Sequence, residues 1–232
     1  MKSLSKNDHD IDILHRDDAL VVASKPGGML VHRSPRSSDQ VFFLQELGRL
    51  VGCHLYPVHR LDRAASGAIA MAFSSEVAKK LQANLSADDA VKEYIALVRG
   101  ETPEQGESQR PLTDHNTGVK KSAHTLFERI AVFSRCSLLR VRIRTGRHHQ
   151  IRRHMSHLCH QMIGDTSHGK GKINTFFREN YGLPRLFLHA AVLDLRHPTA
   201  EGRLRVRSPL PKDLREFLLR LPDIDEELVA GL

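Results

Sequence analysis

Hydrophobic and polar residues alternate between Ser137 and Thr145, so that three aliphatic side chains share one side and three arginines the other. A period of two residues is typical of a strand that is buried on one face. KEYIALVRG (92–100) repeats the alternation, while ALVVASKP (19–26) and AIAMAF (68–73) are nearly continuous apolar runs. The pattern therefore predicts four strands, and the run at 19–26 ends at a Pro-Gly-Gly turn.

Helical periodicity appears in three other segments. Residues 41–50 and 75–85 predict helices, and a serine is available as the N-cap of the second. After the turn Thr145-Gly146-Arg147, four apolar residues fall at i, i+4, i+7 and i+11, which predicts a third helix with one buried stripe. The stripe is Ile151, Met155, Leu158 and Met162, and Arg152, Arg153, His154 and His157 are expected to point away from it.

Residues 101–121 show neither period and are rich in polar residues, Gly and Pro, so we expect a surface loop or a connection between lobes there. Short strands and helices alternate irregularly in the rest of the chain, which favours an α+β or mixed α/β domain. At 232 residues the chain fits one large domain or two small ones.

Composition excludes several protein classes. No apolar run approaches the roughly 20 residues of a membrane-spanning helix, and the N-terminal stretch is polar and acidic, unlike a secretory signal. The three cysteines, Cys53, Cys136 and Cys159, are widely separated and form no CxxC motif. Such a set favours reduced thiols over a disulfide framework. The sequence thus predicts a soluble, cytoplasmic protein without a membrane partner.

Charge narrows the choice of partner. The formal net charge is +8 and the pI is about 9.7. The last twelve residues carry four acids and no Lys or Arg, which leaves 35 basic against 23 acidic residues in the rest of the chain. Residues 129–164 contain eight arginines, five histidines and no acid. This concentration favours a polyanion such as nucleic acid over a solvated basic face.

HRLDRAASG (59–67) places one carboxylate, Asp62, among cations and just before the apolar run 68–73. Taken alone, the segment predicts a turn in which Asp62 caps local amides and pairs with an arginine. The strand that follows suggests a second interpretation, because the mouth of a strand can hold a rigid, partly desolvated carboxylate nucleophile. An aspartate pKa of about 3.9 keeps such a group ionised at neutral pH.

Metal-binding residue types also cluster in the sequence. A zinc site needs about four converging ligands, however, and this region contains neither CxxC nor HExxH. No metal is therefore expected, and the backbone N–H groups at the helix start together with Arg147 favour a phosphate or carboxylate site instead. The potential ligands are His148, His149, His154, His157, His160 and Cys159.

Five blocks of sequence carry a resemblance to a known family. They are KPGGMLVHRS (25–34), HRLDRAASG, KEYIALVRG, TGRHHQIRRHMSHLCHQMIGDTSHG (145–169) and LHAAVLDLRHP (188–198). In this order they resemble the pseudouridine synthases of ribosomal and transfer RNA whose signature is HRLD-x-x-[ST]-SG, above all the branch that modifies a T-stem uridine of tRNA. Ala65 departs from the signature, where the family commonly has threonine.

The resemblance covers residues 17 to about 210 and implies an RNA-modifying isomerase without any cofactor. It implies one catalytic domain over 1–232, with a core at about 11–210, a largely antiparallel central sheet and a cleft between two lobes. We expect no separate N-terminal RNA-binding domain and an acidic C-terminal tail. The implied substrate is RNA, with tRNA favoured, and no obligatory protein partner is implied.

The family's motif also implies roles for single residues. Asp62 matches the nucleophile, which attacks either the uracil ring or the ribose C1′. Arg147 matches the arginine that pairs with it, and Tyr94 the tyrosine that stacks on the uracil and helps to remove the C5 proton. Arg60 matches the residue that fills the space left by a flipped uridine. The other expected RNA contacts are His59, Arg63, Lys25, His32, Arg33, His149, Gln150, Arg152 and Arg153.

Two alternatives remain open from the sequence. The same chemistry could act on rRNA, or the protein could bind RNA without catalysis. The second is disfavoured because the chain has no tryptophan and only 5% aromatic residues, too few for a base-stacking platform.

Overall fold

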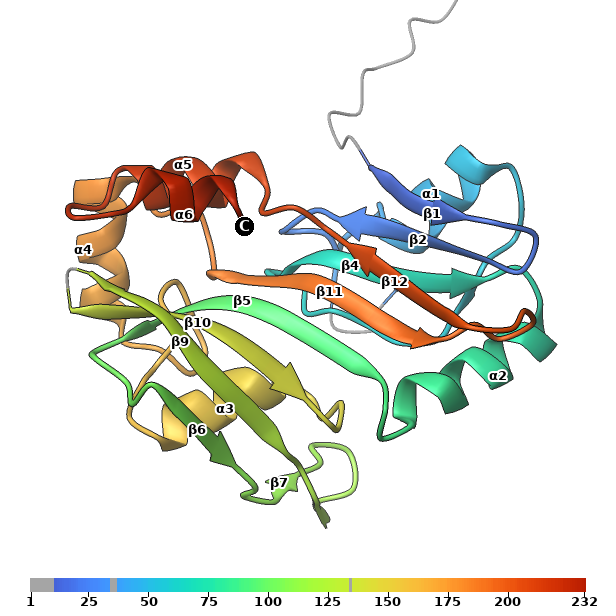
Figure 1. Cartoon of the computed structure of the whole chain (residues 1–232), viewed down its shortest axis with the longest axis horizontal. Coiled ribbons are helices and arrows are strands. Elements are labelled where there is room, and N and C mark those ends of the chain that lie inside the picture. Colours follow the sequence, from blue (N-terminus) through green and yellow to red (C-terminus); the bar gives the residue numbers. More distant parts are fainter. Residues whose placement is uncertain (1–10, 34–36, 134) are drawn as a thin grey trace, which may run out of the picture.

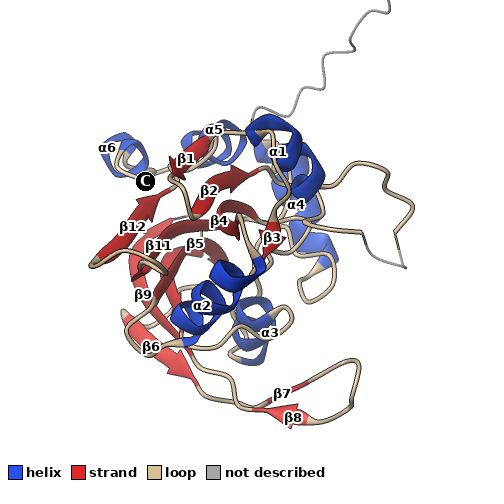
Figure 2. Cartoon of the chain, turned by 90° about the vertical axis from the view of Figure 1, so that its right-hand side faces the viewer, coloured by secondary structure: helices blue, strands red, loops and turns tan. Residues whose placement is uncertain are grey.

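The computed structural model describes residues 11–33, 37–133 and 135–232, and most of its strands join one long, curved sheet (Figures 1 and 2). The helices are α1 (Phe43–Val51), α2 (Ser75–Ser86), α3 (Gln150–His157), α4 (Gly171–Tyr181), α5 (Lys212–Leu219) and α6 (Glu226–Ala230). The strands are β1 (Ile13–Arg16), β2 (Leu20–Lys25), β3 (Tyr56–Pro57), β4 (Ser66–Ala72), β5 (Val91–Arg99), β6 (Gln105–Ser108), β7 (Leu112–Thr113), β8 (Lys120–Lys121), β9 (Thr125–Phe133), β10 (Cys136–Ile143), β11 (Leu188–Arg196) and β12 (Arg203–Arg207).

The sheet has the order β1-β2-β4-β11-β5-β10-β9-β6, with β12 added to β11 and β3 to β4. All of these pairings are antiparallel except that of β4 with β11. The predicted α+β class and largely antiparallel sheet are confirmed, and β2, β4, β5 and β10 lie where the four strands were predicted. No helix of the described ranges is long and apolar enough to cross a membrane.

The parallel contact between β4 and β11 joins the two halves of the sheet, and it depends on one glycine. Gly67 pairs with Ala190 and has φ +115°, in the left-handed region that side chains rarely adopt. A Cβ at this position would collide with the backbone of Ala190. The Ser-Gly of the segment 59–67 is therefore required by this close approach.

Helices cover both faces of β2, which explains its continuous apolar run. In β2, Val21 and Ala23 pack in a cluster with α1, whereas Leu20 and Val22 pack in a cluster with α2. Across β10, the same alternation separates the cluster of α3 from the cluster of α4, α5 and α6. A strand buried on both faces needs apolar side chains at every position.

One prediction about a segment is corrected, and the acidic tail takes a defined structure. Residues 101–121 are not a simple loop or inter-lobe connection, because they contain the edge strand β6 and the β7–β8 hairpin. The acidic end of the chain forms α6, in which Val229 is buried against the cluster of α5. Although the segment is strongly acidic, its apolar side chains pack against the cluster of α5.

The predicted stripe of the third helix is only half right. Ile151 and Met155 are buried, but α3 ends at His157 and does not include Leu158 or Met162. Cys159 adopts the left-handed conformation with φ +63°, and the N–H of the next residue bonds back to Met155 O at 2.9 Å. This is a Schellman ending without the usual glycine, so the sequence carries no signal for it.

Candidate active site

Asp62 lies in the connection from β3 to β4 and faces a cavity of about 430 Å³. The end of α2, the face of β5 and the start of α3 also line this cavity, so both halves of the sheet contribute to it. Asp62 is the only carboxylate among its described lining residues, and 18% of its side chain is exposed. A single carboxylate is thus held partly desolvated but accessible.

Arg152 joins Asp62 to a second, buried aspartate. Its Nη1 donates to Asp62 Oδ2 at 3.0 Å, while Nε and Nη2 donate to the two oxygens of Asp165, each at 2.7 Å. The side chain of Asp165 is completely buried and that of Arg152 is 7% exposed. This bidentate pair fixes the guanidinium, which in turn holds Asp62 by one oxygen. The other oxygen, Oδ1, accepts no hydrogen bond from the described residues.

The ion pairs also set the charges. Burial alone would raise the pKa of Asp165, but its bonds to Arg152 and to the backbone N–H groups of Ser167 and His168 outweigh burial and lower it. Burial likewise opposes the charge of Arg152, yet the hydrogen bonds with Asp165 raise the pKa of the guanidinium. Both groups therefore stay ionised, as Asp62 requires of its partner.

The predicted pairing of Arg147 with Asp62 is wrong, because Arg152 occupies that place. Arg147 lines the same cavity, but its Nε donates to Ser122 O at 2.9 Å. His149, the N-cap of α3, has φ +51°, and this turn directs the first turn of the helix toward Asp62. Spacing along the sequence does not reveal such a turn.

Tyr94 projects from β5 into the cavity. Its burial, and next the negative charge of Asp62, raise the pKa of this phenol well above its usual range. A phenol that stays protonated can stack on a base and donate a hydrogen bond, but it is a poor base. The roles expected for Tyr94, stacking on the uracil and removal of the C5 proton, stay predictions.

Four histidine rings form a row beside Asp62. His115 and His148 meet edge to face at 5.2 Å, His148 and His149 stack at 3.7 Å, and His149 and His168 meet at 5.3 Å between ring centroids. His149 Nε2 lies 3.8 Å from Asp62 Oδ1, and its Nδ1 lies 3.1 Å from His168 Nε2. Burial lowers the pKa of His149 to about 4, so this neighbour of Asp62 is neutral at pH 7.

The predicted RNA contacts fall into two groups, of which one is accessible. Arg60 is exposed and lines the cavity, and Arg63 is exposed while bonding to Asp39 at 3.0 Å. His32 and Arg33 are also exposed. His59 lines the cavity but accepts the N–H of Ala70 through Nε2, which gives it a structural hydrogen bond as well.

Three of the predicted RNA contacts are buried and form internal hydrogen bonds, and their contact with RNA stays a prediction: Lys25, Gln150 and Arg152. Lys25 Nζ donates to the carbonyl oxygens of Pro26, Met29 and Arg63, which ties the loop after β2 to the segment of Asp62. Gln150 donates to His124 O and Thr125 Oγ1. Arg153, which is half-buried, donates to Thr113 O and so attaches β7 to α3. The sequence around these residues gives no sign of these internal hydrogen bonds.

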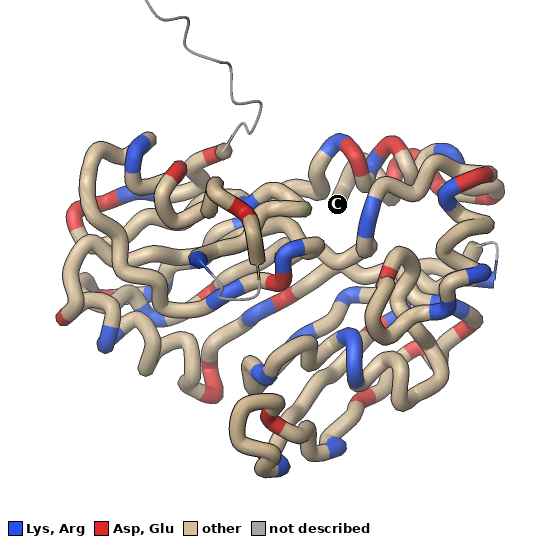
Figure 3. The backbone as a smooth tube through the Cα atoms, turned by 180° about the vertical axis from the view of Figure 1, so that it is seen from behind, with Lys and Arg blue, Asp and Glu red and all other residues tan. Residues whose placement is uncertain are grey.

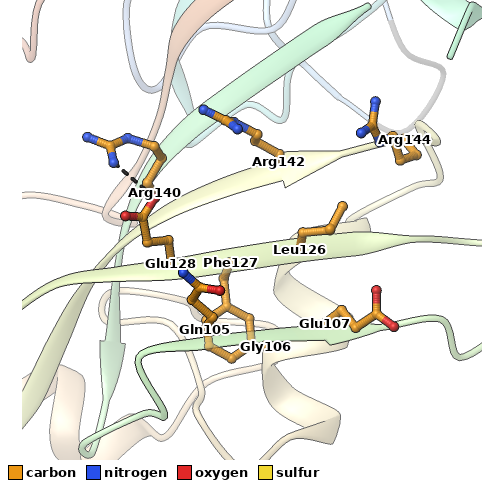
Figure 4. Close-up of a pocket in the computed structure, with 9 residues that line it drawn as sticks. All are labelled: Gln105, Gly106, Glu107, Leu126, Phe127, Glu128, Arg140, Arg142 and Arg144. Atoms are coloured by element: carbon orange, nitrogen blue, oxygen red, sulfur yellow. Dashed lines mark hydrogen bonds and ion pairs between the residues drawn. The ribbon is translucent and has the colours of Figure 1, made fainter. Parts of the chain in front are cut away.

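The second large hollow, about 460 Å³, lies on the opposite face of the sheet (Figure 4). Arg142 pairs with Glu93 in register, whereas the neighbouring Val141 pairs with Tyr94, so the arginines point away from the cavity of Asp62. Arg140 and Arg142 form ion pairs with Glu93 and Glu128. The charge of residues 129–164 is thus divided between two faces and partly neutralised. Basic and acidic positions likewise alternate over both halves in Figure 3.

The candidate metal ligands between residues 148 and 160 do not converge on one point among the described residues. Among the described residues, only His15, Asp17 and His197 lie close enough to share an ion. His197 Nδ1 accepts the N–H of Ala200 at 2.9 Å, which leaves the proton on Nε2 and directs it to Asp17 at 2.9 Å. A metal-bound histidine instead donates from its other nitrogen. His15 and His197 both hydrogen-bond to Asp17 and so join the end of β1 to the turn after β11. This arrangement does not fit a metal ion.

Comparison with known proteins matches residues 19–157 to the model of the family described as RNA pseudouridylate synthase. The chain belongs to this family. It is 37% identical to tRNA pseudouridine synthase C of Vibrio vulnificus (strain CMCP6), over 90% of this chain and 95% of that one. It is 36% identical to tRNA pseudouridine synthase C of Haemophilus ducreyi (strain 35000HP / ATCC 700724), over 87% and 91%. The resemblance read from the five sequence blocks is confirmed, and the chain is an isomerase.

Solved structures of the family share the fold. Human RNA Pseudouridylate Synthase Domain Containing 4 superimposes with a TM-score of 0.74 at 24% identity, covering 90% of this chain and 92% of that one. The corresponding values for human RNA Pseudouridylate Synthase Domain Containing 1 are 0.73, 20%, 96% and 94%. At these identities the likeness establishes the architecture of the pseudouridine synthase fold.

Sequence reasoning missed two residues of the site. Asp165, which anchors Arg152, lies in the GDTSHG block but was given no role, and Lys92, which lines the cavity, was passed over beside Tyr94. The alternation of KEYIALVRG could have found Lys92, because it places residues 92 and 94 on one face of the strand.

Proposed function

We propose that this pseudouridine synthase acts on a uridine of tRNA, with Asp62 as its nucleophile. The proposal of tRNA rests on the relatives named tRNA pseudouridine synthase C, of which one from Vibrio parahaemolyticus serotype O3:K6 (strain RIMD 2210633) is 35% identical over 95% of this chain. A tRNA substrate also fits the cytoplasmic location that the reduced cysteines favour. The observation that carries the mechanism is the single carboxylate of the cavity, held through one oxygen by Arg152.

The reaction is an isomerisation in which no atom is gained or lost from the RNA. The bond from N1 to C1′ breaks, the uracil turns, and a bond from C5 to C1′ forms while the C5 proton leaves and N1 takes up a proton. Asp62 Oδ1 is free to attack either the uracil ring or C1′, because only Oδ2 is bound to Arg152. Arg152 holds this carboxylate in a fixed orientation through Oδ2.

The base must leave its helix to reach Asp62. We propose that a T-stem uridine flips into the cavity, whose volume of about 430 Å³ suits a small ligand. Tyr94 would stack on the uracil there, and the exposed Arg60 at the rim would fill the space left in the RNA. Arg63, His32 and Arg33 supply accessible charge or hydrogen bonds for the RNA outside the cavity.

Tritium release from C5-labelled tRNA transcripts tests the proposal with purified protein, RNA and a chelator alone. We expect stoichiometric release from the wild type and none above background from Asp62→Asn. Asp18→Asn, at an exposed position outside the cavity, is the matched control and should keep the wild-type rate. Release by Asp62→Asn at the control's rate would disprove the role of Asp62.

Mapping of pseudouridines in RNA from cells with and without the gene identifies the substrate. Loss of one T-stem signal in tRNA is the expected result. Loss of an rRNA signal with intact tRNA would reassign the substrate to rRNA while leaving the chemistry unchanged.

A further inference from the structure

Lys92 enters the cavity from β5, two residues before Tyr94 and on the same face of that strand. Its Nζ donates to Leu85 O, near the C-terminal end of α2, at 2.7 Å. An ammonium carries three N–H donors. The other two have no hydrogen-bond partner among the described residues, so they are available to a ligand in the cavity.

The charge of Lys92 is not neutralised by the protein. No carboxylate of the described residues lies within 4.0 Å of Nζ, and burial, followed by the positive charge of Arg144, lowers the pKa of this lysine. Lys25 is also buried, but three carbonyl groups occupy its donors. Keeping the charge of Lys92 half-buried, with one carbonyl partner and Arg144 nearby, costs free energy. An anion bound beside Nζ would offset this cost.

The lining of the cavity carries more positive than negative charge. Arg60, Lys92, Arg147 and Arg152 line it, against Asp62 alone. Arg152 already satisfies Asp62 and Asp165, so the charges of Lys92, Arg60 and Arg147 remain for a ligand. Lys92 lies beside α2, whereas Arg147 and Arg152 lie on the side of α3. Positive charge therefore extends to the wall formed by α2.

We propose that Lys92 binds a phosphodiester oxygen of the RNA backbone at the flipped nucleotide, and so forms a phosphate subsite on the α2 side of the cavity. The inference rests on the proposed function, because it requires RNA to enter this cavity. An ammonium suits a phosphate as a point charge with rotatable donors, and phosphate contacts fix the position of a nucleic acid without reading its sequence.

Salt dependence of tRNA binding distinguishes this role from a structural one. Lys92→Gln should bind tRNA about tenfold more weakly at 0.1 M salt, and the slope of log affinity against log salt should fall by about one. Lys92→Arg keeps the charge and should keep the slope. The matched control is Lys79→Gln, at an exposed position on α2 outside the cavity; its slope should equal that of the wild type.

A substrate stem-loop with single methylphosphonate linkages locates the contact. Removing the charge next to the target uridine should weaken binding by the wild type, and the same change should have little further effect on Lys92→Gln, as expected for two partners of one contact. If Lys92→Gln keeps the wild-type slope and loses only stability toward urea, Lys92 merely caps α2 and the inference fails while the proposed function stands. A wild type that neither binds nor converts tRNA or rRNA would overturn both.

Discussion

Replacing Arg152 with methionine would remove the side chain that joins Asp62 to Asp165. Deleting one partner of a buried ion pair costs about 3–5 kcal/mol of stability. Asp165 Oδ1 would keep the N–H groups of Ser167 at 2.8 Å and His168 at 2.9 Å, so we expect the lower end, about 3 kcal/mol. For a domain of this size the melting temperature should fall by roughly 6–12 °C.

The pH dependence of the loss follows from Asp165. In the wild type its pKa is lowered, so the group stabilises the fold above the unfolded pKa of about 3.9, and this contribution disappears as the pH falls through the folded pKa. Without Arg152, burial should raise the pKa above the unfolded value. The remaining carboxylate then destabilises the fold at pH 7, and the variant should lose less stability relative to wild type at pH 5 than at pH 7.

Urea unfolding followed by circular dichroism at both pH values measures these free energies. The double variant Arg152→Met/Asp165→Asn removes the unpaired charge and should recover at least half of the loss. Arg178→Met, at an exposed position on α4, should stay within about 0.5 kcal/mol of the wild type. A loss below about 1 kcal/mol, or a double variant no more stable than the single one, would refute the account of a buried bridge.

Three further predictions concern stability and pH. Burial, and next the charge of Arg185, lower the pKa of Lys25 to about 7 in the folded protein, whereas the pKa of an unfolded lysine is about 10.4. Between these values the unfolded chain binds the proton and the folded chain does not. The free energy of unfolding of the wild type, measured with urea, should therefore rise between about pH 7 and 10. An equal rise in Lys25→Met would contradict this assignment. Because the pKa of Tyr94 is raised, the phenol should stay protonated up to pH 10. Tyr94→Phe should therefore release tritium more slowly than the wild type, with the same dependence of rate on pH. A change of rate at alkaline pH in the wild type alone would show that the phenol ionises. Gly67→Ala should lower the melting temperature by more than 10 °C or prevent folding, because its Cβ meets the backbone of Ala190, whereas Gly171→Ala, which has open space around it, should melt within a few degrees of the wild type.

The sequence was sufficient for features that depend on local periodicity or on ordered motifs. The alternation at residues 137–145 predicted β10 and its two faces, and the apolar runs predicted β2 and β4. Five blocks in a fixed order were sufficient for the family, since each carries residue types that recur together. HRLDRAASG identified Asp62 as the candidate nucleophile, and the structure places it in a cavity with Tyr94 and Arg147.

Tertiary structure decided which arginine holds Asp62. Arg147 and Arg152 are both basic residues near the start of one helix, and only the left-handed turn at His149 and the burial of Asp165 assign the contact to Arg152. Likewise, the sequence predicted that Lys25 contacts RNA, and only the structure shows that its Nζ donates to three carbonyl groups. Sequence periodicity reports which side of an element is apolar, but the partner of a charged group depends on residues that are distant in the chain and meet only after folding.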